Sequence, residues 1–349
     1  ASPPGVTGSP MLSGGFHSGP ITALDLATQR PLFASACKKD CTVRIWNYLT
    51  RKCQLCHEFR HTPLSLALHP FGYFLVVAFS HRLCFFHILM RELRLYFEFA
   101  LNVQTLRFAS GGHLLAAVDG KLVHIFSTPT LSKVATLHGH SQPITALCFD
   151  PKDHTLITCS GDGKMCEWNA RTWALESNKV SQGSEYLAVA PSDLAGHVCA
   201  SVLRGTKCLL RNLLHCSPDA EDEIDGKVRI QVLCYHAAAS TVFAGTSNGF
   251  LWVFPPAAPA KRSEHALHVG ACTLICLSVD GQTLITGGDD GCIFLLNTSG
   301  LLSEDGRELP AQPGTRSLAG ETVIIPAGEM KQHHEELQNL HAESSALNT

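Results

Sequence analysis

A strand–turn–strand pattern recurs along this chain at a nearly constant spacing. In each copy two short apolar runs with strand composition flank a turn, and the turn residue is most often Asp, Asn or Gly. The turn residues are Asp40, His81, Asp119, Asp162, Gly205, Asn248 and Asp290, at intervals of 38 to 43 residues. A repeat of about 40 to 45 residues with four short strands is typical of a propeller blade, which is one twisted antiparallel sheet. The spacing therefore predicts an all-β protein whose seven units close into a ring.

The unit from Leu137 to Asn169 is the most complete copy. A Gly-His pair precedes its first strand, an Asp-Gly turn follows its second strand and Trp-Asn ends its third. This order is the signature of a WD40 repeat. The residues expected to hydrogen-bond in series are His140, Thr158 or Ser160, Asp162 and Trp168. A buried carboxylate needs such partners. A catalytic His–Asp pair is the alternative, but the structural network already explains the spacing.

The other units carry this set unevenly. The first has His17, Asp40 and Trp46. The last keeps His268 and Asp290, but Leu296 stands where Trp is usual, and the second unit has His81 at its turn. We expect hydrophobic packing alone to hold the units that lack the network.

Composition limits the classes of partner. Of the 349 residues, 45% are hydrophobic and 16% charged, with a net charge of -3. This net charge does not indicate a basic surface of the kind that binds nucleic acid or an anionic membrane. The most apolar stretch, Phe71–Ser80, is too short to span a bilayer. The 15 cysteines are odd in number and lie in strand patterns, so we expect free thiols in a reducing compartment.

Three motifs suggest chemistry that their context does not support. Gly245–Gly249 matches the G-x-S-x-G nucleophile elbow, which needs a helix after it, but an expected strand, Phe250–Phe254, follows. Cys53–His57 matches the C-x-x-C-H haem motif, and zinc at its two cysteines with Cys37 and Cys41 is the other alternative. Its position predicts an outer strand instead. The sequence therefore predicts no catalytic residue, no cofactor and no metal.

The ends of the chain differ from its middle. Residues 1–15 are rich in Gly and Pro and are expected to be disordered, without a signal peptide; residues 16–300 are expected to form the propeller. Residues 301–328 are predicted to be a linker in which Thr322–Ile325 is a candidate closing strand, and residues 329–349 a helix. The heptad spacing of this helix marks the start of a coiled coil that could dimerise. Its expected core positions are Met330, Leu337, Leu340 and Leu347.

Longer phrases resemble one family, the cilia- and flagella-associated protein 57 type. They include HSGPIT (17–22), TVRIWNY (42–48), LALHPFGYFLVVAFSHRL (66–83), FASGGHLLAAVDGKLVHIFST (108–128) and LITCSGDGKMCEWN (156–169). Their order and spacing agree over residues 16–297, and the tail is similar to where that family enters a long coiled coil. The resemblance implies a non-catalytic scaffold of the motile axoneme. It also implies association with inner dynein arms, docking on doublet microtubules and a location in the cytoplasm, cytoskeleton and cilium.

The alternative function is a general WD40 adaptor, such as a ubiquitin-ligase substrate receptor or a trafficking scaffold. That function predicts a basic or aromatic-rimmed central channel for a peptide. Arg44, Arg107 and Arg211 are the candidate residues, although their strand positions favour outward-facing side chains.

Overall fold

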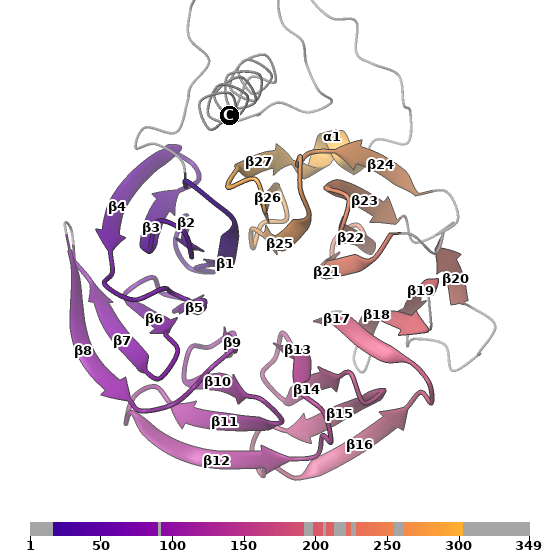
Figure 1. Ribbon diagram of the computed structural model, residues 1–349, viewed down its shortest axis with the longest axis horizontal. Helices are drawn as coiled ribbons and strands as arrows, with labels where there is room; N and C mark the ends of the chain where they lie inside the picture. The colour runs from indigo at the N-terminus through magenta and orange to yellow at the C-terminus, as the bar shows by residue number, and fades with distance from the viewer. Residues whose placement is uncertain are drawn as a thin grey trace, which may run out of the picture.

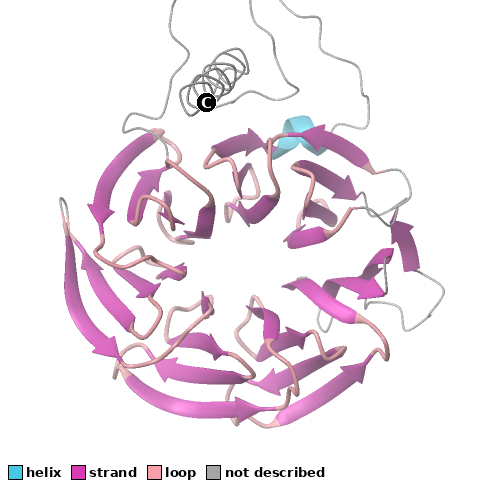
Figure 2. Cartoon of the chain, in the orientation of Figure 1, coloured by secondary structure: helices cyan, strands magenta, loops and turns pink. Residues whose placement is uncertain are grey.

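The computed structural model describes residues 17–89, 92–191, 198–204, 207–212, 221–224, 228–254 and 262–302. These residues form antiparallel sheets arranged in a ring around a common axis (Figure 1). The expected all-β WD40 propeller is confirmed. The one helix among the described residues, α1 (Thr298–Leu302), is short and lies at the edge of the ring (Figure 2).

The sheets follow one another along the chain, and we number them in that order. The first contains β1 (Ile21–Leu26), β2 (Leu32–Cys37), β3 (Thr42–Asn47) and β4 (Lys52–Glu58). The second contains β5 (Ser65–Leu68), β6 (Phe74–Ala78), β7 (Leu83–Ile88) and β8 (Leu93–Phe99). The third contains β9 (Thr105–Phe108), β10 (Leu114–Asp119), β11 (Leu122–Ser127) and β12 (Ser132–His138). The fourth contains β13 (Ile144–Phe149), β14 (Thr155–Ser160), β15 (Lys164–Asn169) and β16 (Leu175–Val180).

The remaining sheets repeat this plan. The fifth contains β17 (Glu185–Pro191), β18 (Val198–Arg204), β19 (Lys207–Asn212) and β20 (Glu221–Ile224). The sixth contains β21 (Ile230–His236), β22 (Thr241–Thr246), β23 (Phe250–Phe254) and β24 (Ser263–Ala266). The seventh contains β25 (Cys272–Leu277), β26 (Thr283–Gly288) and β27 (Ile293–Asn297). In every sheet the first strand lies nearest the axis and the last lies outermost (Figure 1).

The prediction of seven complete blades is wrong. Six sheets are complete four-stranded blades, and the seventh has three strands within the described ranges. After β27 the chain enters α1, and the described residues end with that helix. Of the predicted linker, residues 301 and 302 end α1. The predicted segment 1–15, the strand Thr322–Ile325 and the helix 329–349 lie outside the described residues.

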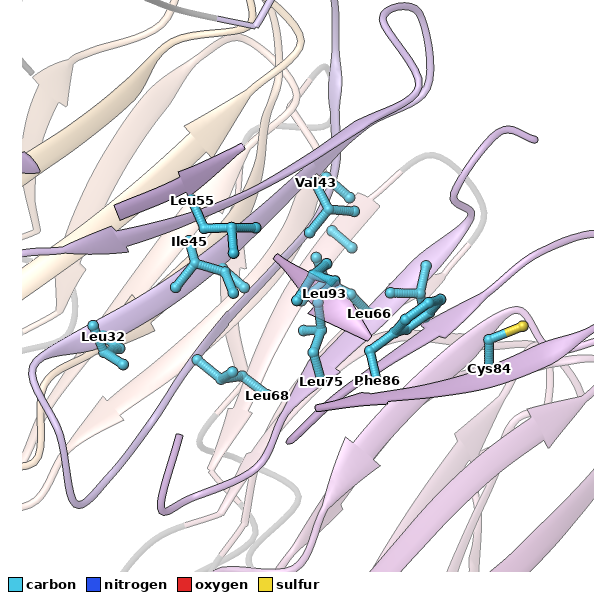
Figure 3. Packing of buried hydrophobic residues seen from close by; sticks show 14 of the residues in the cluster. Leu32, Val43, Ile45, Leu55, Leu66, Leu68, Leu75, Cys84, Phe86 and Leu93 are labelled. Atoms are coloured by element: carbon cyan, nitrogen blue, oxygen red, sulfur yellow. The ribbon is translucent and has the colours of Figure 1, made fainter. Parts of the chain in front are cut away.

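Each sheet buries both faces against its neighbours, which explains the composition of its strands. β2 reads LFASAC and is buried along its whole length, whereas β4 at the rim is mostly exposed or half-buried. Between the first and second sheets, Val43 and Ile45 pack against Leu66 and Leu75 (Figure 3). Such burial contributes about 25 cal/mol for each Å² of apolar surface. The core is therefore a series of contacts between adjacent blades.

Among the described helices, none has the length and apolar character that a membrane span requires.

Candidate functional site

The fourth sheet brings together all four residues that the sequence singled out there. His140 Nδ1 lies 3.4 Å from Asp162 Oδ1, and His140 Nε2 lies 2.8 Å from Thr158 Oγ1. Trp168 Nε1 donates to the same Thr158 oxygen at 3.0 Å. Thr158 is thus the hydroxyl in the chain, since Ser160 Oγ donates instead to the carbonyl oxygens of residues 142 and 143.

The first sheet repeats this network. His17 Nδ1 lies 3.1 Å from Asp40 Oδ2, and His17 Nε2 lies 2.8 Å from Ser35 Oγ. Trp46 Nε1 donates to Ser35 Oγ at 2.8 Å. The sequence reasoning missed Ser35. It lies eighteen residues after the histidine, as Thr158 does in the fourth sheet, and that spacing would have identified it.

In the seventh sheet His268 Nδ1 lies 3.0 Å from Asp290 Oδ1, and its Nε2 lies 3.0 Å from Thr286 Oγ1, which was also missed. Leu296 is buried, and the network there ends at the threonine.

Burial and hydrogen bonding shift the pKa of His17, His140 and the three network carboxylates. Burial lowers the pKa of His17 and of His140, so both imidazoles are neutral near pH 7. Burial favours the protonated form of Asp40, but hydrogen bonds from neighbouring hydroxyl and N–H groups outweigh it and lower its pKa to about 2. The same balance lowers the pKa of Asp162 and Asp290. A neutral imidazole with both nitrogens engaged has no site left for proton transfer to a substrate.

The second sheet replaces this network with apolar residues. Leu66 pairs with Val77 in the register in which Leu147 pairs with Thr158, so Val77 stands where the hydroxyl would be. Phe59 lies eighteen residues before Val77, in the place of the histidine, and Phe86 takes the place of the tryptophan. The Phe59 and Phe86 ring centroids are 5.3 Å apart. Since His81 is exposed at the turn, this unit is held by packing, as expected.

The innermost strands place one equivalent residue each towards the axis. The register of each first strand with its second identifies the ring as Asp25, Ala67, Arg107, Cys148, Val189, Cys234 and Cys276. All but Ala67 line a cavity of about 470 Å³ on the propeller axis. Burial raises the pKa of Cys148 to about 12 and that of Cys234 to about 11, so these groups remain thiols. The channel ring thus offers one acid, one base and three thiols.

The acid and the base of this ring are paired across it. Arg107 Nη1 donates to Asp25 Oδ1 at 3.0 Å, and the backbone N–H of Leu68 donates to Asp25 Oδ2 at 2.8 Å. Burial raises the pKa of Asp25, and both contacts oppose that shift. The carboxylate therefore links the first, second and third sheets, while 45% of the Arg107 side chain is exposed to the channel. A cation held in this way can contact a peptide carbonyl or carboxylate at the channel mouth.

The three arginines considered from the sequence have different positions. Arg107 was expected to face outwards, and this expectation is wrong because the innermost strand points it at the axis. Arg44 is buried, with its guanidinium 5.9 Å from the Trp46 ring centroid. Arg211 is on β19, and its side chain is outside the described set. Aromatic rings of Phe108 and Tyr235 also line the cavity.

The motifs that suggested chemistry lie in an ordinary hairpin turn and an ordinary strand. Ser247 of the G-x-S-x-G match is in the turn between β22 and β23, and a strand follows, as expected. Cys53 and Cys56 are on the outer strand β4. Among the described side chains, the one group with metal-ligand atoms close together is His17, Cys37 and Asp40. Two members of that group are the network pair of the first sheet, with both histidine nitrogens already engaged.

A family model for the WD domain, G-beta repeat, matches residues 9–47, 131–169 and 262–297. These stretches cover the first three strands of the first sheet, the outer strand of the third sheet with the first three strands of the fourth, and the outer strand of the sixth sheet with the three described strands of the seventh. They contain all three His–Asp networks described above. The family model therefore matches the blades that carry the polar network and does not match the aromatic second blade.

Sequence similarity to individual proteins extends beyond these repeats. Cilia- and flagella-associated protein 57 of Mus musculus is 32% identical over 84% of this chain, which covers 23% of that protein. Cilia- and flagella-associated protein 57 A of Tetrahymena thermophila is 22% identical over 93% of this chain and 28% of its own length. WD repeat and HMG-box DNA-binding protein 1 of Mus musculus is 26% identical over 51% of this chain. The resemblance to the protein 57 type is confirmed, and the chain spans about a quarter of the length of those relatives.

Proposed function

We propose that this chain, a WD40 propeller similar in sequence to cilia- and flagella-associated protein 57, is a non-catalytic scaffold of the cilium or flagellum. The observation that carries the proposal is the extent of the similarity. The mouse relative aligns over 84% of the chain, whereas the WD40 model matches three separate stretches. The likeness therefore includes atypical blades and is more specific than a shared repeat.

The physical character of the propeller supports a binding role. Loops and strand edges are displayed by sheets that bury both faces against their neighbours, which suits a rigid interaction platform. The His–Asp pairs of the three networks are fully engaged within their blades. Function therefore belongs to the surfaces and the channel of the propeller.

The finer proposal concerns place and assembly. We propose that the chain acts in the motile axoneme, in the assembly or docking of inner dynein arms on doublet microtubules. Residues 329–349 begin a coiled coil that joins two copies through Met330, Leu337, Leu340 and Leu347. Thr322–Ile325 is a candidate for the fourth strand beside β27, and it would give the ring seven four-stranded blades.

The test is the location of the tagged full-length protein in a ciliated cell, with detergent extraction to leave bare axonemes. We expect the protein to stay with the axoneme after detergent and to leave it in high salt. A diffuse signal with no axonemal fraction would overturn the ciliary proposal. The propeller fold would be unaffected by either result.

A second candidate function, a general peptide adaptor, is favoured by one observation. Arg107 lies in the channel with almost half of its side chain exposed, next to an aromatic lining. An adaptor of this kind would bind a soluble partner through the channel. Arg107→Ala would then abolish that partner's binding while leaving axonemal retention unchanged. Loss of retention with unchanged soluble binding would instead support the scaffold.

A further inference from the structure

The first sheet differs from the other two network sheets by one thiol. Cys37 is the last residue of β2, and its register equivalents are Ser160 in the fourth sheet and Gly288 in the seventh. A Cβ built at Gly288 would meet His268 Nδ1 and Asp290 Oδ1. The position therefore points at the His–Asp pair of its sheet, and in the first sheet it brings a sulfur atom to that pair.

The thiol completes a group of three ligand atoms. One ring nitrogen of His17, Sγ of Cys37 and one carboxylate oxygen of Asp40 all lie within 4.8 Å of one another, the one such group among the described side chains. His17 Nδ1 and Asp40 Oδ2 are 3.1 Å apart. In tetrahedral zinc, two N or O ligands lie about 3.3 Å apart, and a thiolate lies about 3.5 Å from each of them. The His–Asp pair is therefore already at zinc spacing, and Cys37 has to approach by no more than about 1.3 Å.

The chemistry of these three atoms suits Zn²⁺. Proteins bind zinc through thiolate sulfur, imidazole nitrogen and carboxylate oxygen. A neutral imidazole, a carboxylate and a thiolate carry two negative charges together, which cancel the charge of the ion in a buried place. His17 Nε2 lies 2.8 Å from Ser35 Oγ, to which Trp46 Nε1 donates at 2.8 Å. A hydrogen bond of this kind at the second ring nitrogen orients a histidine that binds a metal.

The group lies where the ring closes. β1 of the first sheet lies beside β25 of the seventh (Figure 1). The turn of the seventh sheet packs on the segment that carries His17, because a Cβ at Gly291 would lie 2.8 Å from the carbonyl oxygens of His17 and Gly19. An ion held by His17, Cys37 and Asp40 would fasten this segment to the turn between β2 and β3. The Asp40 side chain is 16% exposed, which opens the group to solvent.

We propose that His17, Cys37 and Asp40 bind one Zn²⁺ ion, with water as the fourth ligand, and that the ion anchors the start of the propeller. The ion lies between His17 Nδ1 and Asp40 Oδ2, in place of the proton that they share. The single ring proton of His17 is then on Nε2 and is donated to Ser35 Oγ. The thiol proton of Cys37 passes to solvent, so one proton is released for each ion bound.

The test uses the full chain, kept reduced and freed of metal with a chelator. Zn²⁺ is added directly, and Co²⁺ serves as a coloured probe of the same site. We expect one equivalent of cobalt to give the strong visible bands of a four-coordinate ion together with a thiolate-to-cobalt charge-transfer band. Zinc should displace the cobalt and raise the melting temperature, because it binds the folded chain.

Two cysteine variants locate the sulfur ligand. Cys37→Ser gives the first sheet the residue that the fourth sheet has, so the blade should fold. It should lose the charge-transfer band and bind zinc at least about 100-fold more weakly, since removing even an outer contact of a ligand costs about 10- to 100-fold. The matched control is Cys41→Gly, because Cys41 has a φ of 53° where the other network sheets have Gly163 and Gly291. Its Sγ faces Lys38 O, so zinc binding should be unchanged.

Two aspartate variants locate the oxygen ligand. Asp40→Asn keeps the size of the side chain and removes its charge. We expect at least about tenfold weaker zinc binding, with the charge-transfer band of the Cys37 thiolate retained. The matched control is Asp162→Asn, at the same place in the fourth sheet, where Ser160 replaces the thiol. This variant should bind zinc as the wild type does.

Four results would overturn the proposal. They are no stoichiometric binding, a cobalt spectrum without the charge-transfer band, zinc binding that Cys37→Ser does not weaken, or equal effects of Asp40→Asn and Asp162→Asn. All of these measurements concern the interior of one blade in the purified protein. The location of the protein in a ciliated cell is measured separately, so the zinc site and the ciliary proposal can fail independently.

Discussion

The second and fourth sheets form the same four-stranded blade around different interiors. In the fourth, His140, Thr158 and Trp168 are joined by hydrogen bonds of 2.8 and 3.0 Å. In the second, Phe59 and Phe86 occupy the places of the histidine and the tryptophan and contact each other ring to ring. Strand order is the same in the two sheets, and the four pairs of β5 with β6 keep the register of the corresponding pairs of β13 with β14.

The comparison separates what makes a blade from what a polar network adds to it. Both sheets are buried on two faces, and that burial is sufficient to hold four strands together. A buried polar network makes each member depend on the others, because removing one leaves its partners unsatisfied. An aromatic cluster has no such requirement. The second sheet is therefore freer to vary, and it is the sheet whose outer strand carries exposed aromatic residues.

The largest effect should come from Trp168→Ala. The side chain is buried, and its N–H donates to Thr158. Its removal leaves a cavity and an incomplete network, so we expect a loss of about 3–5 kcal/mol in the free energy of unfolding. Denaturant titration measures it. If the free energy of unfolding fell by less than it does when an exposed residue is substituted, the assignment of Trp168 to the blade interior would be wrong.

Asp162→Ala tests the polar network more directly. The carboxylate accepts from His140 and from the backbone N–H of Ser141 and Lys164, so its loss should cost about 1–3 kcal/mol. The comparison residue is His81, at the equivalent turn of the second sheet. It is exposed, and His81→Ala should change stability by no more than about 0.5 kcal/mol. If Asp162→Ala and His81→Ala lowered the melting temperature by the same amount, the two blades would not differ in the way described here.

Acid should weaken the network blades through their histidines. The pKa of His140 and His17 lies below the ordinary value of 6.5, so between those values the unfolded chain binds more protons than the folded one. Stability is therefore fully present above pH 6.5 and is lost as pH falls through the lowered pKa. The lowered pKa of Asp162 adds a second loss below its ordinary value of 3.8, while the raised pKa of Asp25 acts in the opposite direction.

Unfolding titrations between about pH 5 and 7 measure this slope, with about 1.4 kcal/mol for each unit by which a pKa is shifted. The matched variant is His140→Gln, which removes one of the titrating imidazoles. Its slope should be shallower than that of the wild type. An unchanged slope would show that His140 does not contribute to the acid loss.

The sequence predicted the blades from one spacing and the networks from one pattern. The 38 to 43 residue interval of the turns and the position of His, Asp and Trp are local features, so they are visible without coordinates. Six complete blades were located in this way. The candidate for the fourth strand of the seventh sheet, Thr322–Ile325, lies outside the described residues and stays a prediction, because a closing strand can come from a distant segment and no local pattern fixes its position.

The orientation of Arg107 was predicted wrongly for a different reason. Arg107 was a candidate for the channel but was expected to face outwards because it lies in a strand pattern, and a single strand does not say which of its faces meets the axis. The ring appears when blades are compared: Asp25, Cys148 and Cys276 each lie ten residues before the network hydroxyl of their own sheet. Arg107 lies ten residues before Ala117, which takes that position in the third sheet. The sequence did contain this information, but only in the position that these residues share when the repeats are aligned with one another.

Converting one interior into the other should cost less than breaking the polar network at a single residue. Thr158→Val alone leaves His140 Nε2 and Trp168 Nε1 without their shared partner, and we expect it to cost about 1–3 kcal/mol. The triple change of Thr158→Val, His140→Phe and Trp168→Phe gives the fourth sheet the residues of the second. The imidazole, hydroxyl and indole are then removed together, and Asp162 keeps the backbone N–H groups of Ser141 and Lys164, so the triple variant should lie within about 1.5 kcal/mol of the wild type. The three single variants and the triple variant, measured by denaturant unfolding, give the coupling energy. If the triple variant lost the sum of the single losses, the two interiors would not be interchangeable, and the second blade would owe its stability to contacts outside this cluster.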